Sequence, residues 1–339
     1  MPEHGGRVMQ AARQYGIPAA DWLDLSTGIN PRGYPVPPVP AAAWQRLPED
    51  DDDLVRSAAA YYGLHDPARL LTIAGTQAAI QALPRVLGQG APLRVAVAGL
   101  TYNEYAHAWR RGHAVTAHAY PALPEAAARA DVAVVCRPNN PTGAALPVDQ
   151  LLRMREDLAA RKGWLLVDEA YVDADPQASL TPVFEKEGWQ GVIVLRSVGK
   201  FFGLAGARVG FALAQAPLIE ALRAELGPWP VAGPARYVAT QALRDTPWQR
   251  GTQMYLADMS GKLDQLLQGT LALNPVGTAL FRWFEHPHAE ALHAHLARAA
   301  ILVRIFAAPS FGTRSSLRIG LPADDAQLAR LRRALESFR

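Results

Sequence analysis

Polar residues with reactive side chains follow three short apolar runs in this chain of 339 residues. The runs at 131–136, 164–167 and 191–196 are mostly apolar at consecutive positions, which is typical of strands buried on both faces of a parallel sheet. Open α/β sheets bind ligands beyond the carboxyl ends of their strands. We therefore expect one site to receive the side chains that follow these runs, namely Asn140, Asp168 with Tyr171, and Ser197 with Lys200.

The acid and the amine of this set favour a cofactor that carries a carbonyl and a cationic ring. Asp168, at the end of a buried strand, is costly as an unpaired anion, and a protonated ring nitrogen is a suitable partner. Lys200 lies on a loop flanked by glycines and can form a Schiff base with a carbonyl.

A phosphate group is suggested by residues before and after these runs. Ser197 and Arg208 can hold a phosphate by hydrogen bonds. Thr76 and Gln77 follow Gly75 at the start of a predicted helix, where N–H groups and the positive end of the helix dipole favour an anion. A carbonyl, a basic ring nitrogen and a phosphate in one small molecule describe pyridoxal phosphate.

Each of these features also has an ordinary structural explanation. A buried acid at a strand end is often only a hydrogen-bonding group, a lysine after a strand is usually solvated, and a Gly-Thr pair is often a plain helix cap. The segment 140–143 (NPTG) has the composition of a common turn. It is the combination, in this order along the chain, that favours a cofactor site.

Composition excludes several classes of protein. Half of the residues are apolar and 19% are charged, which excludes a disordered or coiled-coil chain. The chain has 34 Lys and Arg residues and 31 Asp and Glu residues, and it has no run of basic residues that could follow a phosphate backbone. These features argue against a nucleic-acid-binding protein. No stretch approaches about 20 uninterrupted apolar residues, so we expect no membrane span. The single cysteine, Cys136, fits a reducing compartment, so we expect a cytoplasmic protein.

The order of predicted elements favours an α/β fold. Strand-like runs alternate with helical patterns up to about residue 214, which predicts a mostly parallel central sheet flanked by helices. We expect an N-terminal arm and linker (1–40), a large cofactor-binding domain (41–215) and a smaller C-terminal α+β domain (216–339). Prolines between residues 31 and 40 predict the linker, because proline fixes φ and lacks an N–H. The last part has strand-like runs at 270–275, 278–284, 301–306 and 316–321.

The motifs NNPTG, DEAY, SVGK and GLAGARVG, in this order, resemble those of the fold-type-I, aspartate-aminotransferase-like family of pyridoxal-phosphate enzymes. The resemblance implies that Lys200 binds the cofactor covalently and later moves protons, and that Asp168 pairs with the ring nitrogen. It implies contacts with the phenolic oxygen from Tyr171 and Asn140. It further implies that Ser197, Arg208, Thr76 and the backbone around Gly75 hold the phosphate. It also implies that Tyr102 stacks on the ring and that Arg318 binds the α-carboxylate of the substrate.

The N-terminus resembles one branch of this family, the threonine-phosphate decarboxylases. His4-Gly5-Gly6 and LDLSTGINPRG (23–33) resemble the opening of those enzymes. Two positions depart from the pattern: Gly28 stands where Asn is frequent, and Leu47 replaces a tyrosine that reaches the cofactor phosphate of the neighbouring subunit. The resemblance implies substrate contacts from His4, Gly5, Gly28, Asn140, Arg304 and Arg318.

The resemblance implies a homodimeric decarboxylase of L-threonine O-3-phosphate in cobalamin biosynthesis. The first alternative is an aminotransferase of the histidinol-phosphate type. The second is a non-catalytic binding protein on the same fold, against which Lys200 argues because a binder needs no Schiff base. No metal is expected, because His286, His288, His293 and His295 lack the i, i+4 spacing of a helical zinc pair.

Overall fold

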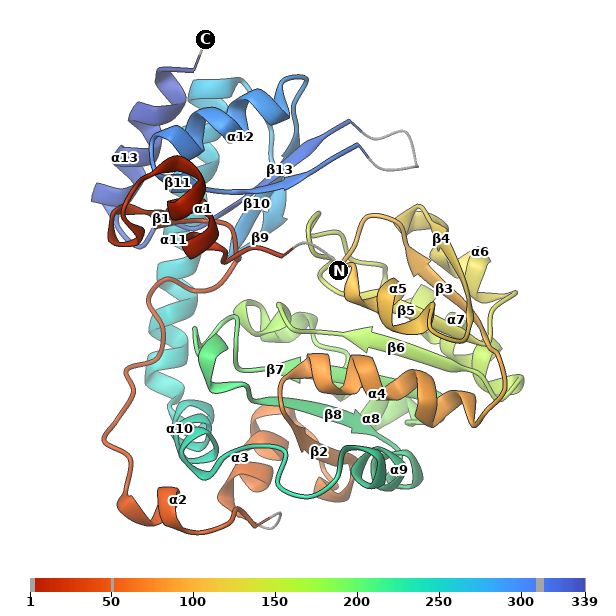
Figure 1. Cartoon of the computed structure of the whole chain (residues 1–339). Coiled ribbons are helices and arrows are strands. Elements are labelled where there is room, and N and C mark those ends of the chain that lie inside the picture. Colours follow the sequence, from red (N-terminus) through yellow and green to blue (C-terminus); the bar gives the residue numbers. More distant parts are fainter. Residues whose placement is uncertain (1–3, 50–51, 309–313, 339) are drawn as a thin grey trace.

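A seven-stranded sheet forms the centre of the computed structural model, which describes residues 4–49, 52–308 and 314–338 (Figure 1). The strand order is β2-β8-β7-β6-β5-β3-β4, and β8 is antiparallel to both of its neighbours while the other pairs are parallel. The expected mostly parallel α/β sheet is therefore confirmed. Its strands are β2 (Leu70–Ile73), β3 (Arg94–Ala98), β4 (Ala114–His118), β5 (Val132–Cys136), β6 (Trp164–Asp168), β7 (Val192–Ser197) and β8 (Gly210–Ala214).

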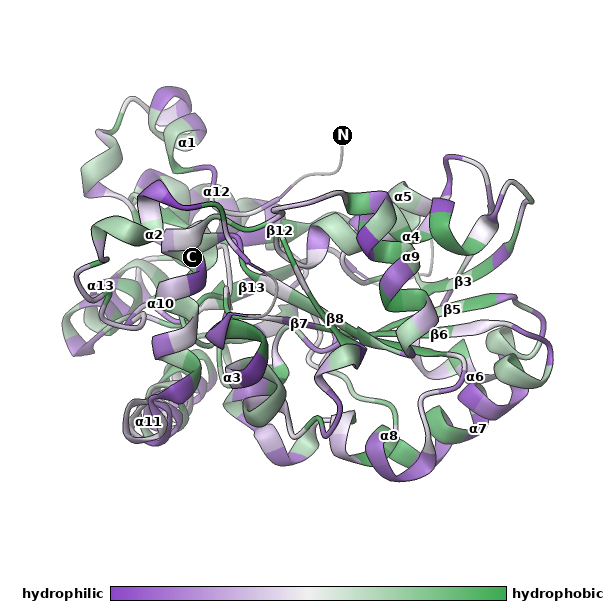
Figure 2. Cartoon of the chain, turned by 90° about the horizontal axis from the view of Figure 1, so that it is seen from below, coloured by the Kyte–Doolittle hydropathy of each residue, from purple (hydrophilic) through white to green (hydrophobic). Residues whose placement is uncertain are grey.

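Helices cover both faces of this sheet, so its central strands are buried on both sides (Figure 2). In β6, Leu166 packs toward one layer, whereas Leu165 and Val167 pack toward the other. This alternation explains why the strands are apolar at consecutive positions. One layer contains α4 (Thr76–Gly88), α5 (Glu104–Trp109) and α9 (Ala216–Leu226), and the other contains α3 (Asp53–Tyr62), α6 (Leu123–Ala127), α7 (Val148–Ala160) and α8 (Thr181–Glu187).

The C-terminal part is built on a four-stranded antiparallel sheet with the order β12-β13-β10-β9. Two long helices lead into it, α10 (Gly233–Arg244) and α11 (Thr246–Leu271), and α11 runs beside both parts of the molecule (Figure 1). The remaining elements are β9 (Val276–Thr278), β10 (Phe281–Glu285), α12 (Ala289–Arg298), β12 (Arg304–Phe306), β13 (Ser316–Gly320) and α13 (Asp325–Glu336).

The N-terminal segment packs on this C-terminal part. After α1 (Val8–Tyr15), strand β1 (Leu23–Asp24) pairs in parallel with β11 (Ile301–Leu302). The proline-rich stretch 31–40 then has neither helix nor strand and leads to α2 (Ala41–Gln45). The domain boundaries at residues 40 and 215 stay predictions.

Some expected elements differ from the structure. The strand expected at 270–275 is wrong, because α11 continues to Leu271 and Ala272 ends it in the left-handed conformation. The run 301–306 is two strands in two sheets, β11 and β12. Strand β2 was not predicted, since its run is only four residues long. Within the described ranges, no helix is both long enough and apolar enough to cross a bilayer.

Candidate active site

A cavity of about 130 Å³ lies at the carboxyl ends of the central strands. These ends belong to β5, β6 and β7, which are neighbours in the sheet. The structure therefore brings together residues spread over more than 130 positions of sequence. The cavity lining includes all of the predicted cofactor-binding residues: Gly75, Thr76, Gln77, Tyr102, Asn140, Asp168, Tyr171, Ser197, Lys200 and Arg208.

Asp168 is the buried acid of this cavity, at the end of β6. Tyr105 Oη donates to its Oδ2 at 2.8 Å, and the Ala170 N–H donates to its Oδ1 at 2.9 Å. Burial raises the pKa of the Asp168 carboxyl, while these two hydrogen bonds and the Lys200 charge oppose the rise. A further cation in the cavity would relieve the cost of burying this carboxylate.

Lys200 lies on the loop that follows β7. Its Nζ is 5.4 Å from the centre of the Tyr171 ring. Its backbone carbonyl accepts hydrogen bonds from the N–H of Asn30 at 3.0 Å and from the N–H of Gly203 at 3.2 Å. The loop is thus held by backbone contacts that do not depend on the lysine side chain.

Gly75 and Arg208 form a close contact at the start of α4. Both have a positive φ, 74° and 52°. A Cβ at position 75 would lie 2.5 Å from Arg208 Nη2, so a side chain there would displace the guanidinium, and the positive φ also favours glycine. Thr76 begins the 13-residue helix α4, and Ser197 ends β7 in the same cavity lining. Helix N–H groups, a guanidinium and hydroxyls form a suitable site for a phosphate.

Tyr102 and Gln77 are linked in the wall formed by α4 and α5. Tyr102 Oη donates to Gln77 Oε1 at 3.1 Å, and Gln77 Nε2 donates to Glu104 Oε2 at 2.7 Å. Burial, aided by the charge of Glu104, raises the pKa of the Tyr102 phenol, so it remains protonated as a donor. The hydrogen bond restrains the ring that is predicted to stack on the cofactor.

Arg318 of β13 connects the C-terminal sheet to the cavity. Its Nη1 donates to Asn140 Oδ1, and its Nη2 donates to the Ser26 carbonyl at 2.5 Å. Burial lowers the pKa of Arg318, and within the described residues its Nε has no hydrogen-bond partner. The oxygens that accept from the buried Arg318 guanidinium are neutral and do not balance its positive charge. An anionic ligand would therefore bind favourably beside it.

The other predicted substrate residues gather at the N-terminal arm. His4, Gly5 and Arg304 line a second cavity of about 230 Å³. Arg304 lies opposite Arg318 on β12 and β13, so both side chains project from the same face of the sheet. His4 Nε2 lies 2.8 Å from Glu104 Oε1, a partner that the sequence did not predict.

Gly28 lies beside Tyr171 and Phe281 with a φ of 60°. A Cβ there would lie 3.0 Å from Phe281 Cδ1 and 3.5 Å from Tyr171 Oη. Both the conformation and the space therefore favour glycine. This position contributes only backbone to the site.

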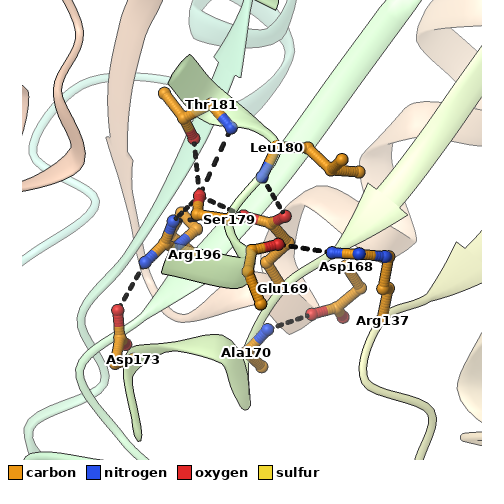
Figure 3. Close-up of polar contacts among 10 residues, drawn as sticks. Arg137, Asp168, Glu169, Ala170, Asp173, Ser179, Leu180, Thr181 and Arg196 are labelled. Atoms are coloured by element: carbon orange, nitrogen blue, oxygen red, sulfur yellow. Dashed lines mark hydrogen bonds and ion pairs between the residues drawn. The ribbon is translucent and has the colours of Figure 1, made fainter. Parts of the chain in front are cut away.

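A buried ionic cluster supports the turn after β6 (Figure 3). Arg196 Nη1 is 3.1 Å from Glu169 Oε2, and Arg196 Nη2 donates to Asp173. Residues 179–180 donate two further hydrogen bonds to Glu169. Burial raises the pKa of both carboxyls, and Arg196 opposes the rise. Because breaking a buried ion pair costs about 3–5 kcal/mol, this cluster holds in place the turn that begins at Asp168.

Comparison with known proteins identifies the family. Residues 47–335 match the model of the family described as aminotransferase class I and II. The chain belongs to this family.

Several members of the family are similar to the chain along its whole length. It is 49% identical to a threonine-phosphate decarboxylase of Pseudomonas aeruginosa, with 100% of this chain and 98% of the relative covered. It is 42% identical to a threonine-phosphate decarboxylase of Sinorhizobium sp, with 98% and 97% covered. The solved histidinol-phosphate aminotransferase of Sinorhizobium meliloti, in complex with pyridoxal-5′-phosphate, has the same fold, with a TM-score of 0.82, 21% identity, and 99% and 94% of the chains covered.

Pyridoxal phosphate, the cofactor of this family, fits the residues of the cavity. The Arg208 guanidinium, the Ser197 hydroxyl and the first residue of α4, Thr76, line the cavity together and suit the phosphate of this cofactor. At Asp168 the buried carboxylate suits a protonated ring nitrogen, and Lys200 lines the same cavity with the amine that is predicted to form the covalent link. The individual contacts of each residue with the cofactor stay predictions.

Two functional candidates were missed by the sequence analysis. Tyr105 bonds Asp168, and Glu104 bonds Gln77 and His4. Both belong to the segment LTYNEY, from which only Tyr102 was selected. Helical spacing offered a signal for Tyr105 alone, because it lies three residues after Tyr102, whereas nothing in the local pattern selects Glu104.

Proposed function

We propose that this member of the aminotransferase class I and II family is a pyridoxal-phosphate-dependent carboxy-lyase. It converts L-threonine O-3-phosphate to CO2 and (R)-1-amino-2-propanol O-2-phosphate, the linker of the nucleotide loop of cobalamin. The observation that carries the proposal is that Arg318, which bonds Asn140 of the cofactor cavity, lies opposite Arg304, which lines the second cavity. Two arginines that project from the same face of a sheet suit a ligand with both a carboxylate and a phosphate. The full-length decarboxylase relatives support the same substrate.

Asp168, Arg318 and Lys200 have different roles in this reaction. When bound, pyridoxal phosphate supplies an electron sink for the pair left as the bond between Cα and the carboxylate breaks. Asp168 keeps the ring nitrogen protonated, and Arg318 orients the carboxylate that leaves as CO2. Lys200 Nζ binds the cofactor and then holds the proton that replaces CO2 at Cα.

Incubating the holoenzyme with phosphothreonine alone tests this function. We expect CO2 and aminopropanol phosphate to accumulate through many turnovers, because decarboxylation regenerates the cofactor without a second substrate. An aminotransferase would stop after one half-reaction, with the cofactor in the pyridoxamine form. Such a stop, or turnover only with 2-oxoglutarate and histidinol phosphate, would replace the decarboxylase proposal by the aminotransferase alternative.

Arg304→Ala is expected to weaken substrate binding without changing the cofactor. A hydrogen bond between charged groups contributes about 2 kcal/mol, so the KM for phosphothreonine should rise about 30-fold. The absorption spectrum of the bound cofactor should be unchanged. An unchanged KM would show that Arg304 has only a structural role in β12.

We also propose that the active form is a homodimer. Large apolar side chains are exposed on this chain, among them Trp44 (70%), Leu47 (64%) and Trp229 (56%). Exposed apolar residues that lie close together mark sites of protein association, and Trp44 and Leu47 are only three positions apart. Light scattering at micromolar concentration should give about twice 36.6 kDa. An active monomer would refute the proposal.

A further inference from the structure

Glu104 is a buried carboxylate beside the cofactor cavity that the proposed chemistry does not use. Its side chain is only 9% exposed. Oε2 accepts hydrogen bonds from Gln77 Nε2 at 2.7 Å and from Gln81 Nε2 at 3.1 Å, and Oε1 lies 2.8 Å from His4 Nε2. An ionised carboxylate can only accept, so His4 must donate from Nε2.

The contact between His4 and Glu104 joins two parts of the molecule. The arm that carries His4 packs on the C-terminal part through β1 and β11. Its Gly6 N–H donates to Ser26 Oγ at 2.7 Å, and the Ser26 carbonyl accepts from Arg318. Glu104 instead belongs to α5, on the large sheet. Figure 1 shows the arm extending from the C-terminal part toward the side of the large sheet that carries α5.

The same carboxylate also reaches the aromatic wall of the cavity. Through Gln77, Glu104 is connected to the hydroxyl of Tyr102. The His4 ring lies 5.8 Å from the Tyr102 ring, measured between centroids. One buried acid thus holds both the end of the arm and the side chain predicted to stack on the cofactor.

We propose that Glu104 is a positioning residue that latches the N-terminal arm onto the cofactor-binding part of the enzyme. By fixing His4 against Tyr102, it sets the distance between the substrate-binding arginines of the C-terminal sheet and the cofactor cavity. The substrate named in the test rests on the proposed function, whereas the latch itself does not.

Glu104→Gln separates the two roles of the carboxylate. The amide oxygen can still accept from Gln77 and Gln81, because the opposite orientation would leave two donors facing an NH2 group. The NH2 group then faces His4 Nε2, which accepts from it only in the other imidazole tautomer. The variant therefore replaces the charge-assisted arm contact with a weaker, neutral hydrogen bond and retains the contact with the cavity wall.

Hydrogen–deuterium exchange of the arm, measured on the holoenzyme without substrate, tests the latch directly. We expect Glu104→Gln and His4→Ala to speed exchange of residues 7–15 at least fivefold, with unchanged cofactor affinity. The matched control is Glu225→Gln, which removes a carboxylate that bonds Arg85 of α4 at 2.6 Å on the exposed side. Unchanged exchange in Glu104→Gln would overturn the proposal. If the Glu104→Gln protein fails to fold, His4→Ala still tests the latch.

A double-mutant cycle on phosphothreonine turnover tests the effect on the reaction. Each single variant should raise KM about tenfold with little change in kcat, and the double variant should be no worse than the more severe single variant. Additive effects would show that the two residues act independently and would overturn the latch. If the wild-type enzyme does not turn over phosphothreonine, the proposed function fails, while the exchange experiment still decides the latch.

Discussion

Replacing Lys200 by alanine is expected to lower turnover by roughly 10³-fold or more, because the variant loses both the covalent anchor and the proton carrier. The fold should be retained, since the loop is held by the hydrogen bonds that the Lys200 carbonyl accepts from Asn30 and Gly203. Cofactor should still bind through Ser197, Arg208 and Asp168. Borohydride reduction followed by mass spectrometry should attach the cofactor to the wild-type protein at Lys200 and leave the variant unlabelled.

Two further variants serve as controls for the Lys200→Ala experiment. Lys200→Arg keeps the positive charge but is not a nucleophile, so it should be as inactive as the alanine variant. Lys186→Ala removes an exposed lysine of α8 and should turn over normally. Normal turnover by Lys200→Ala would contradict the assigned role of the lysine and the covalent chemistry with it.

Asp168→Asn is expected to slow the reaction about 100-fold or more while the protein remains folded. The carboxylate keeps the ring nitrogen of the cofactor protonated, and each pKa unit of such support is worth about 1.36 kcal/mol, or tenfold in rate. An amide gives no such support, although it can keep the hydrogen bonds with Tyr105 and Ala170. Single-turnover kinetics with phosphothreonine measure the loss. A rate within a few-fold of wild type would mean that Asp168 only braces the turn.

The stability of the apoprotein gives a second readout for Asp168. Burial raises its pKa in the native state above the unfolded value. The native apoprotein therefore holds the proton more tightly, and its stability falls as the pH rises from the unfolded pKa through the folded pKa. Asparagine has no carboxyl to ionise, so Asp168→Asn removes this decrease of stability with rising pH. The apo variant should therefore melt at or above the temperature of the apo wild type at neutral pH. Cofactor should raise the melting temperature of wild type more than that of the variant.

Much of the fold and of the cofactor site could be predicted from the sequence because the signals are local. Consecutive apolar residues mark strands covered on both faces, and the residue that follows a strand reaches the ligand-binding edge of the sheet. For this reason Asn140, Asp168 and Lys200 could be selected before the structure was known. They line one cavity because β5, β6 and β7 are neighbours in the sheet.

Contacts between distant segments could not be predicted in the same way. Periodicity does not separate β11 from β12 in the run 301–306, since their division depends on pairing with β1 and β13. It also does not distinguish Asp168 from the adjacent Glu169. The first bonds Tyr105 of α5, whereas the second is buried with Arg196 in the ionic cluster. Their functions differ because of which layer each faces.

The sequence by itself determined the residue types of the site and their order along the chain, because these depend on strands and turns that form locally. Only the tertiary structure decided their partners. His4 and Glu104 are 100 positions apart, and Ser26 and Arg318 are 292 apart. A hydrogen bond requires its two atoms to lie within about 3 Å of each other. These pairs therefore form only when the N-terminal arm is packed on the C-terminal sheet, and when the arm and that sheet both lie against the large sheet. The proposed latch therefore depends on packing that no local pattern encodes.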